Sequence, residues 1–202
     1  LKPFKTSKEL LDGTVKMFNE IDPYFGDCIQ TMDTMKHLDL ESKDGKSPGG
    51  YNYPLYEIGV PFIFMNSVGS ANDLVTMVHE GGHAIHSFLS RDLALTGFKN
   101  LPSEVAELAS MSMELLSMEK WNHFYTNEDD FKRAKKEQLE SIIKILPWIA
   151  QVDEFQHWLY ENHTHSKTER TAKWVSLGKE YGTGLTDWTG FENVAATSWQ
   201  RQ

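Results

Sequence analysis

The residues best placed to do chemistry are His79-Glu80-Gly81-Gly82-His83. In a helix, two histidines four positions apart lie on one face, about one turn from each other, so both imidazoles reach a single metal ion. This H-E-x-x-H spacing is typical of a catalytic zinc site, where the intervening glutamate lies beside the metal and accepts a proton from the water that the metal activates. We therefore predict His79 and His83 as zinc ligands and Glu80 as the general base. The alternative interpretation is two core histidines that are satisfied by buried partners.

The stretch around this motif predicts a buried helix that starts near Ser70. Ser70 or Asn72 is suited to cap the helix, and Asp73 suits its first turn. Apolar residues then form a broad surface: Leu74, Val75, Met77, Val78, Ile85, Phe88 and Leu89. The adjacent glycines within the motif cost about 2 kcal/mol together relative to alanine. A metal-site helix has a reason to carry them, because missing side chains let a neighbouring backbone or a substrate approach closely.

A third ligand is expected on a second helix, which the pattern predicts from Pro102-Ser103 to about Tyr125. Glu104, Glu107 and Glu114 recur at spacings of three and seven, so they share a face and periodicity does not distinguish them. The helix dipole alone explains a glutamate in the first turn, such as Glu104. The other two lie in an apolar run, where a charge is costly unless it is paired or bound to metal. We predict Glu107 as the third zinc ligand and Glu114 as the residue that orients a ligand histidine.

Composition restricts the class of protein. The chain has 202 residues, 40% hydrophobic, which suits one globular core, and its single Cys28 excludes an intramolecular disulfide. No 18-residue apolar run or signal-like start is present, so we expect no membrane span and a cytoplasmic location. A net charge of -9 argues against nucleic acid and anionic membranes as partners.

The remaining pattern is mainly helical. Amphipathic helices are predicted over residues 7–20, 22–37, 131–146, 149–161 and 167–181, and Pro147 is expected to end or kink the helix over 131–146. Between 51 and 66 the chain reads as two short extended segments, which Pro54 and Pro61 confine to edges or irregular ladders. An edge strand before the zinc helix is suited to bind an extended peptide by strand addition. An ordinary hairpin that covers the core explains the same pattern equally well.

Several motifs together resemble the thimet oligopeptidase and oligoendopeptidase F family. Residues 79–86 read H-E-G-G-H-A-I-H, and 107–114 read E-L-A-S-M-S-M-E, similar to that family's H-E-x-G-H-x-x-H and E-x-x-S-x-x-x-E. The family's first glutamate of the second motif is a zinc ligand, which agrees with the positional argument for Glu107. Upstream, residues 45–51 resemble its G-K-x-x-G-x-Y loop, and residues 61–66 resemble its substrate-aligning strand. Gly81 departs from the pattern, because the family more often has a larger residue there.

The resemblance implies a mainly α, helical zincin-like metallopeptidase core with a small β-hairpin or edge strand before the zinc helix. It implies one Zn²⁺ per chain, oligopeptide substrates and hydrolysis by metal-activated water. It also implies a set of substrate-binding residues, namely Gly49, Gly50, Tyr51, Ile63, Phe64, Met65 and His86. The alternative function is a non-catalytic zinc- or peptide-binding helical module derived from the same fold.

We expect the chain to be a single catalytic-domain fragment. It starts at Leu1 without methionine, and its end lacks the segment with His and several Tyr that the resembling family uses to bind substrate. Within it we expect N-terminal helices over 1–42, a loop and short strands over 43–69, zinc-site helices over 70–126 and C-terminal helices over 127–202.

Overall fold

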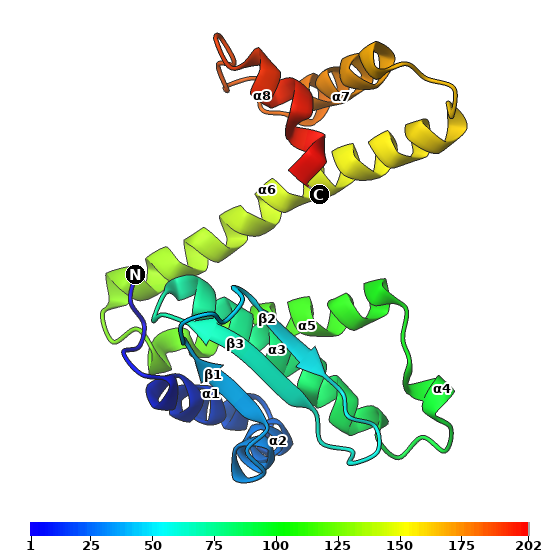
Figure 1. Cartoon of the computed structure of the whole chain (residues 1–202). Coiled ribbons are helices and arrows are strands. Elements are labelled where there is room, and N and C mark those ends of the chain that lie inside the picture. The colour runs from blue at the N-terminus through cyan, green and yellow to red at the C-terminus, as the bar shows by residue number, and fades with distance from the viewer. Residues whose placement is uncertain (202) are drawn as a thin grey trace. The chain divides into compact units, whose positions relative to one another are not determined.

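The structure, a computed structural model, describes residues 1–201 and is mainly helical with one small three-stranded sheet (Figure 1). This confirms the predicted fold class. The chain divides into two compact units, one of residues 1–135 and one that starts at residue 136. That they form one catalytic domain with the four expected segments stays a prediction. Within the described part of the chain, no helix has both the length and the apolar character needed to cross a membrane.

Two helices of the first unit start where their capping residues predict. Asp22 accepts a hydrogen bond from the Tyr24 N–H, with Pro23 in the first turn. Ser70 accepts from the Asp73 N–H while the Asp73 side chain accepts in return, a reciprocal capping box. The first unit contains the helices α1 (Ser7–Ile21), α2 (Pro23–Thr34), α3 (Ala71–Ser90), α4 (Thr96–Lys99) and α5 (Ser103–Ser117). The last one continues as a 3-10 helix over Met118–His123, so the predicted helix to Tyr125 changes type after Ser117.

The sheet contains β1 (Leu38–Glu41), β2 (Gly50–Tyr53) and β3 (Phe62–Ser67) in the order β1-β3-β2. β3 is parallel to β1 and antiparallel to β2. The two extended segments were predicted to lie at edges or in irregular ladders, and β3 is central in a ladder with β1 whose register shifts between Asp39 and Glu41. Pro61 precedes this strand and removes no hydrogen bond from its ladder. β2 does lie at an edge, where Pro54 ends it.

Helix α3 lies at the centre of the first unit and contacts α1, α2, α5, β2 and β3. Its inward face is mainly apolar and is buried in the main core, through Leu74, Met77, Val78, Ala84, Ile85 and Phe88. Leu89 was expected on this apolar surface, but its side chain is 63% exposed. The buried surface is thus narrower than predicted, because it ends at Phe88.

The second unit is helical and is built around aromatic residues. It contains the C-terminal part of α6 (Glu128–Glu161), then α7 (Lys167–Tyr181), α8 (Glu192–Thr197) and a 3-10 helix over Ser198–Arg201. Phe155, Trp174 and Leu177 form its buried core. The two helices predicted on either side of Pro147 form one continuous helix. Proline removes the hydrogen bond to the carbonyl of residue 143, and Ile143 is 69% exposed.

Candidate metal centre

Three side chains with metal-binding atoms meet between α3 and α5. The His79 Nε2 atom lies 3.2 Å from Glu107 Oε2, and the His83 Nε2 atom lies 3.7 Å from Glu107 Oε1. Their possible ligand atoms all lie within 4.8 Å of one another, and residues 1–201 contain no other such cluster of three or more His, Cys, Asp or Glu. Two imidazoles and one carboxylate, with the nitrogen and oxygen atoms converging, form the donor set of many catalytic zinc sites. The residues present therefore fit a zinc ion.

The adjacent glycines of α3 allow two neighbouring helices to pack closely against it. A Cβ atom on Gly82 would lie 2.8 Å from the Ser110 Cα atom and 3.1 Å from the Ala109 carbonyl oxygen, so the α5 backbone packs directly against α3. A Cβ atom on Gly81 would lie 2.9 Å from the Phe18 ring of α1. Close approach of a neighbouring backbone, one of the two reasons predicted for this pair, is thus found at Gly82. The contact places α5, and with it Glu107, next to the two histidines.

Glu114 holds the His79 ring in one orientation. The His79 Nδ1–H donates to Glu114 Oε1 over 2.7 Å, which leaves Nε2 directed toward Glu107. This hydrogen bond, opposed by burial, raises the pKa of His79, whereas burial and the nearby His79 lower the pKa of His83. A carboxylate on the second nitrogen is the usual partner of a histidine that binds metal, because it selects the tautomer and raises the basicity of the ligand atom. The geometry is that expected for the role predicted for Glu114.

Ser110 orients the carboxylate of Glu107, a contribution that we did not predict. Its hydroxyl lies 3.0 Å from Glu107 Oε2 and 3.0 Å from the Glu107 carbonyl oxygen. The sequence signal for this contact was the spacing of three residues between Glu107 and Ser110, which brings both side chains to one face of α5. Glu107 was predicted as a ligand because a charge buried in an apolar run is costly, and this reason needs correction. The apolar run does not bury Glu107, since Leu108, Met111 and Leu115 are exposed and the Glu107 side chain is 44% exposed.

Glu80 is buried next to the two histidines. Only 7% of this residue is exposed, and the backbone N–H of Asn52 on β2 donates to its carboxylate. Burial, as the largest effect, raises the pKa of Glu80, which makes its carboxylate a stronger proton acceptor than one in water. The carboxylate thus lies in an environment suited to accept and return a proton.

The predicted substrate-binding residues occupy different surroundings. Ile63 and Met65 are buried in the core, and β3 is paired along both edges, so β3 has no free edge for another strand. Phe64 stacks with the half-exposed Tyr51 of β2, with ring centroids 5.1 Å apart. Gly49 precedes β2 in a left-handed conformation, with φ of 94°, and Gly50 starts that strand.

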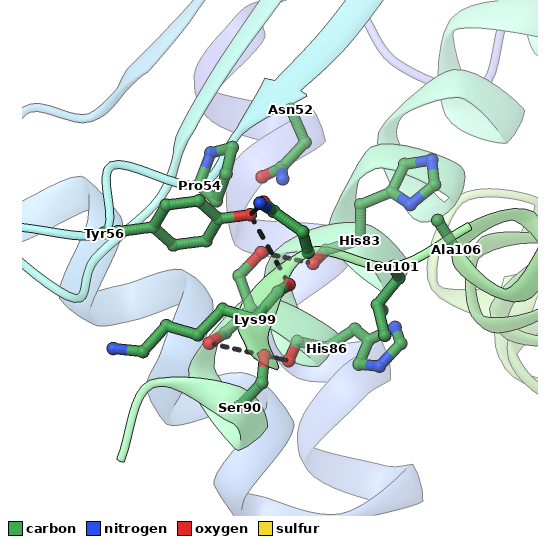
Figure 2. Close-up of a pocket in the computed structure, with 11 residues that line it drawn as sticks. Asn52, Pro54, Tyr56, His83, His86, Ser90, Lys99, Leu101 and Ala106 are labelled. Atoms are coloured by element: carbon green, nitrogen blue, oxygen red, sulfur yellow. Dashed lines mark hydrogen bonds between the residues drawn. The ribbon is translucent and has the colours of Figure 1, made fainter. Parts of the chain in front are cut away.

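A cavity of about 390 Å³ lies beside His83 in the first unit (Figure 2). It is lined by residues of β2, the loop after it, α3 and the α3–α5 connection: Asn52, Pro54, Tyr56, His83, His86, Ser87, Ser90, Lys99, Asn100, Leu101 and Ala106. Its volume lies in the range of about 300–1,000 Å³ that ligand sites occupy. His86, which was predicted to bind substrate, is one helical turn beyond His83 on the wall of this cavity.

Cys28 has no part in the site. The thiol belongs to the core, and burial raises its pKa to about 11, so very little thiolate is present near neutral pH. Thiol nucleophilic chemistry is thus excluded for this residue.

We predict that Gly82→Ala destabilises the first unit and weakens zinc binding. The added methyl must displace the α5 backbone, and overpacking of this kind costs about 1–3 kcal/mol. Gly178→Ala, in α7, is the matched control. A Cβ atom at Gly178 would meet only Gln151, at 3.5 Å, which is an ordinary van der Waals contact. Urea denaturation and zinc titration of both variants measure the effects. Equal behaviour of the two variants would show that close packing at Gly82 is unimportant.

Comparison with known proteins agrees with this mainly helical fold. Residues 25–198 match Peptidase family M3, and the chain belongs to this family. This confirms the resemblance seen in the motifs.

Several proteins align with this chain over part of their own length. It is 34% identical over 111 residues to oligopeptidase PepF of Bacillus subtilis. This alignment covers 55% of this chain and 16% of that protein. The chain is 30% identical over 184 residues to mitochondrial intermediate peptidase 2 of Cryptococcus neoformans, covering 81% of this chain and 21% of the relative. The solved structure of PZ peptidase A with an inhibitor superposes with a TM-score of 0.86 at 30% identity, over 98% of this chain and 35% of that one. The chain therefore spans about a fifth of the length of these two relatives, or less.

Proposed function

We propose that the full-length protein containing this chain is a zinc-dependent peptidase that hydrolyses oligopeptides. The observation that carries the proposal is the convergence of His79, His83 and Glu107, with the buried Glu80 in the same turn of α3. Family membership supports a peptidase, and the name of the relative oligopeptidase PepF supports peptides as substrates.

His79, His83 and Glu107 would hold one Zn²⁺ ion. When bound, the ion supplies Lewis-acid activation of a water molecule and of the scissile carbonyl group. Glu114 keeps the His79 Nε2 lone pair directed to the ion, and Ser110 restricts the rotation of the Glu107 carboxylate. These two residues position the ligands and need no contact with substrate.

Glu80 would move the proton. Its carboxylate takes a proton from the attacking water and delivers it to the amine that leaves as the peptide bond breaks. The Asn52 N–H fixes one side of this carboxylate, and burial favours its protonated form between the two transfers. Glu80 therefore acts first as a general base and then as a general acid.

The edge strand β2 is the element best suited to align a peptide. β2 pairs with β3 on one side and contacts α3, while residues 1–201 place no strand on its other side (Figure 1). An extended peptide could add there by backbone hydrogen bonds. The loop before β2 is held by Lys46, whose Nζ atom donates to the carbonyl oxygens of Asp39 and Glu41 over 3.0 and 2.7 Å. This anchor keeps Gly49, Gly50 and Tyr51 beside the sheet.

Removal and return of zinc test the proposal. We expect a chelator to abolish cleavage of short synthetic peptides by the full-length protein, and one equivalent of zinc per chain to restore it. Mass spectrometry of the products identifies the cleaved bond, and an unrelated folded protein serves as a control substrate. Zinc binding without cleavage of any peptide would leave the non-catalytic zinc- or peptide-binding module as the function. The predicted cytoplasmic location stays a prediction.

A further inference from the structure

The cavity beside His83 contains one buried acceptor without a partner. The Oδ1 atom of Asn52 is inaccessible to solvent, and no group within residues 1–201 donates to it. Figure 2 shows the Asn52 amide pointing into the space between Pro54 and His83. A buried carbonyl oxygen without a hydrogen bond costs free energy, so such an atom in a cavity indicates a missing donor. The backbone of the same residue donates to Glu80, which places this acceptor close to the candidate reaction centre.

Three hydroxyl groups on the cavity wall already donate to the protein. The Tyr56 hydroxyl donates to Asn100 Oδ1 over 2.9 Å, and this bond joins the loop after β2 to the connection before α5. The hydroxyls of Ser87 and Ser90 donate to the backbone carbonyls of His83 and His86 over 3.0 and 2.7 Å. Among the residues of the wall, Asn52 is the one with a buried side-chain oxygen that has no hydrogen-bond partner within residues 1–201.

The charges of the wall favour a neutral ligand group. None of the residues that line the cavity has a carboxylate, so an ammonium or guanidinium group would find no counter-charge on the wall itself. The one permanent cation of the wall, Lys99, extends away from Asn52 and donates to the Arg91 carbonyl oxygen (Figure 2). An uncharged side chain that donates an N–H meets both requirements.

We propose that this cavity is a substrate subsite for a carboxamide side chain, Gln or Asn, and that Asn52 determines this specificity through its Oδ1 atom. The inference rests on the proposed function, because the cavity adjoins His83, a candidate metal ligand. The volume of about 390 Å³ is large enough for one side chain together with the backbone that carries it.

A set of peptides with one varied position tests the proposal. The peptides share one sequence and carry Gln, Leu or Lys at each position that flanks the cleaved bond. We expect the full-length, zinc-loaded protein to prefer Gln over Leu and Lys at one of these positions by roughly tenfold in kcat/KM, as expected for one buried hydrogen bond. Asn52→Leu should abolish the preference for Gln over Leu. Asn52→Asp should reverse the order of Gln and Lys, because it supplies the missing counter-charge.

Ratios between peptides separate specificity from general damage to the site. A change at Asn52 that disturbs Glu80 alters kcat for all peptides alike, so it cancels in the ratio. Asn66→Asp is the matched control, because Asn66 also has a buried Oδ1 atom without a partner in the described chain but lies outside the cavity wall. This variant should leave the ratios unchanged.

Binding measured in a Glu80→Gln background distinguishes the two proposals. If the peptides bind with the same order and the same reversal in Asn52→Asp, but wild type cleaves none of them, the subsite stands and the peptidase proposal fails. Cleavage with ratios that Asn52→Asp leaves unchanged would overturn the subsite. Absence of any difference between Gln, Leu and Lys in both assays would also overturn it.

Discussion

In the full-length protein, we expect the replacement of Glu80 with glutamine to lower peptide turnover by about 10²–10⁴-fold, the range that a general acid–base group contributes. Glutamine keeps the size of the side chain and its bond from the Asn52 N–H, but it accepts no proton from water. Because Glu80 is outside the cluster of ligand atoms, zinc binding should persist. Steady-state kinetics and elemental analysis on the same preparation measure both quantities.

Two results would contradict this assignment of the proton acceptor. Full turnover by Glu80→Gln would require another base, and a loss of zinc in parallel with turnover would make Glu80 a structural support of the metal site. Glu57→Gln is a suitable control, since this glutamate is exposed in the loop between β2 and β3 and should retain full activity.

Glu107→Gln should weaken zinc binding by at least about 10²-fold. A four-ligand zinc site is worth about 10–16 kcal/mol, which is roughly 3 kcal/mol for each ligand, or about a hundredfold in Kd. The neutral amide also removes the one negative charge among the three ligands. Zinc content after dialysis, followed by titration with a competing chelator, measures the loss.

Glu104→Gln is the matched control for this change. Glu104 lies one turn earlier on α5, is exposed and is outside the ligand cluster, so this variant should bind zinc like wild type. The opposite result, zinc lost with Glu104→Gln and retained with Glu107→Gln, would mean that the wrong glutamate of α5 was assigned. No zinc in the wild-type full-length protein would leave His79 and His83 as core residues.

Helix ends were predicted accurately where a capping residue or a terminating glycine marks them. Ser70 and Asp73 form the capping box that starts α3, and the helix predicted over 167–181 has the bounds of α7. The spacing of His79 and His83 was enough to expect them on one face of a helix, whereas Glu107 was chosen by its position in an apolar run and by the family resemblance. The structure brings these three side chains together.

The features that the sequence did not reveal depend on tertiary contacts. β1 has only four residues, Leu38–Glu41, and exists through its pairing with β3, so no periodicity could indicate it. The helix α6 continues through Pro147 against the local preference for a break. Asn52 was missed because a lone asparagine in a strand has no motif, and only the cavity next to it shows that its amide is buried without a partner.

The contact at Gly82 has a mechanical consequence for the site. The separation of α3 and α5 is determined there by backbone atoms, which have none of the rotamer freedom through which side chains absorb strain. The distance between the histidine pair and Glu107 is therefore determined by two helix backbones in direct contact rather than by flexible side chains between them. A site constructed in this way is preorganised, so an incoming ion would spend little of its binding free energy on ordering the protein.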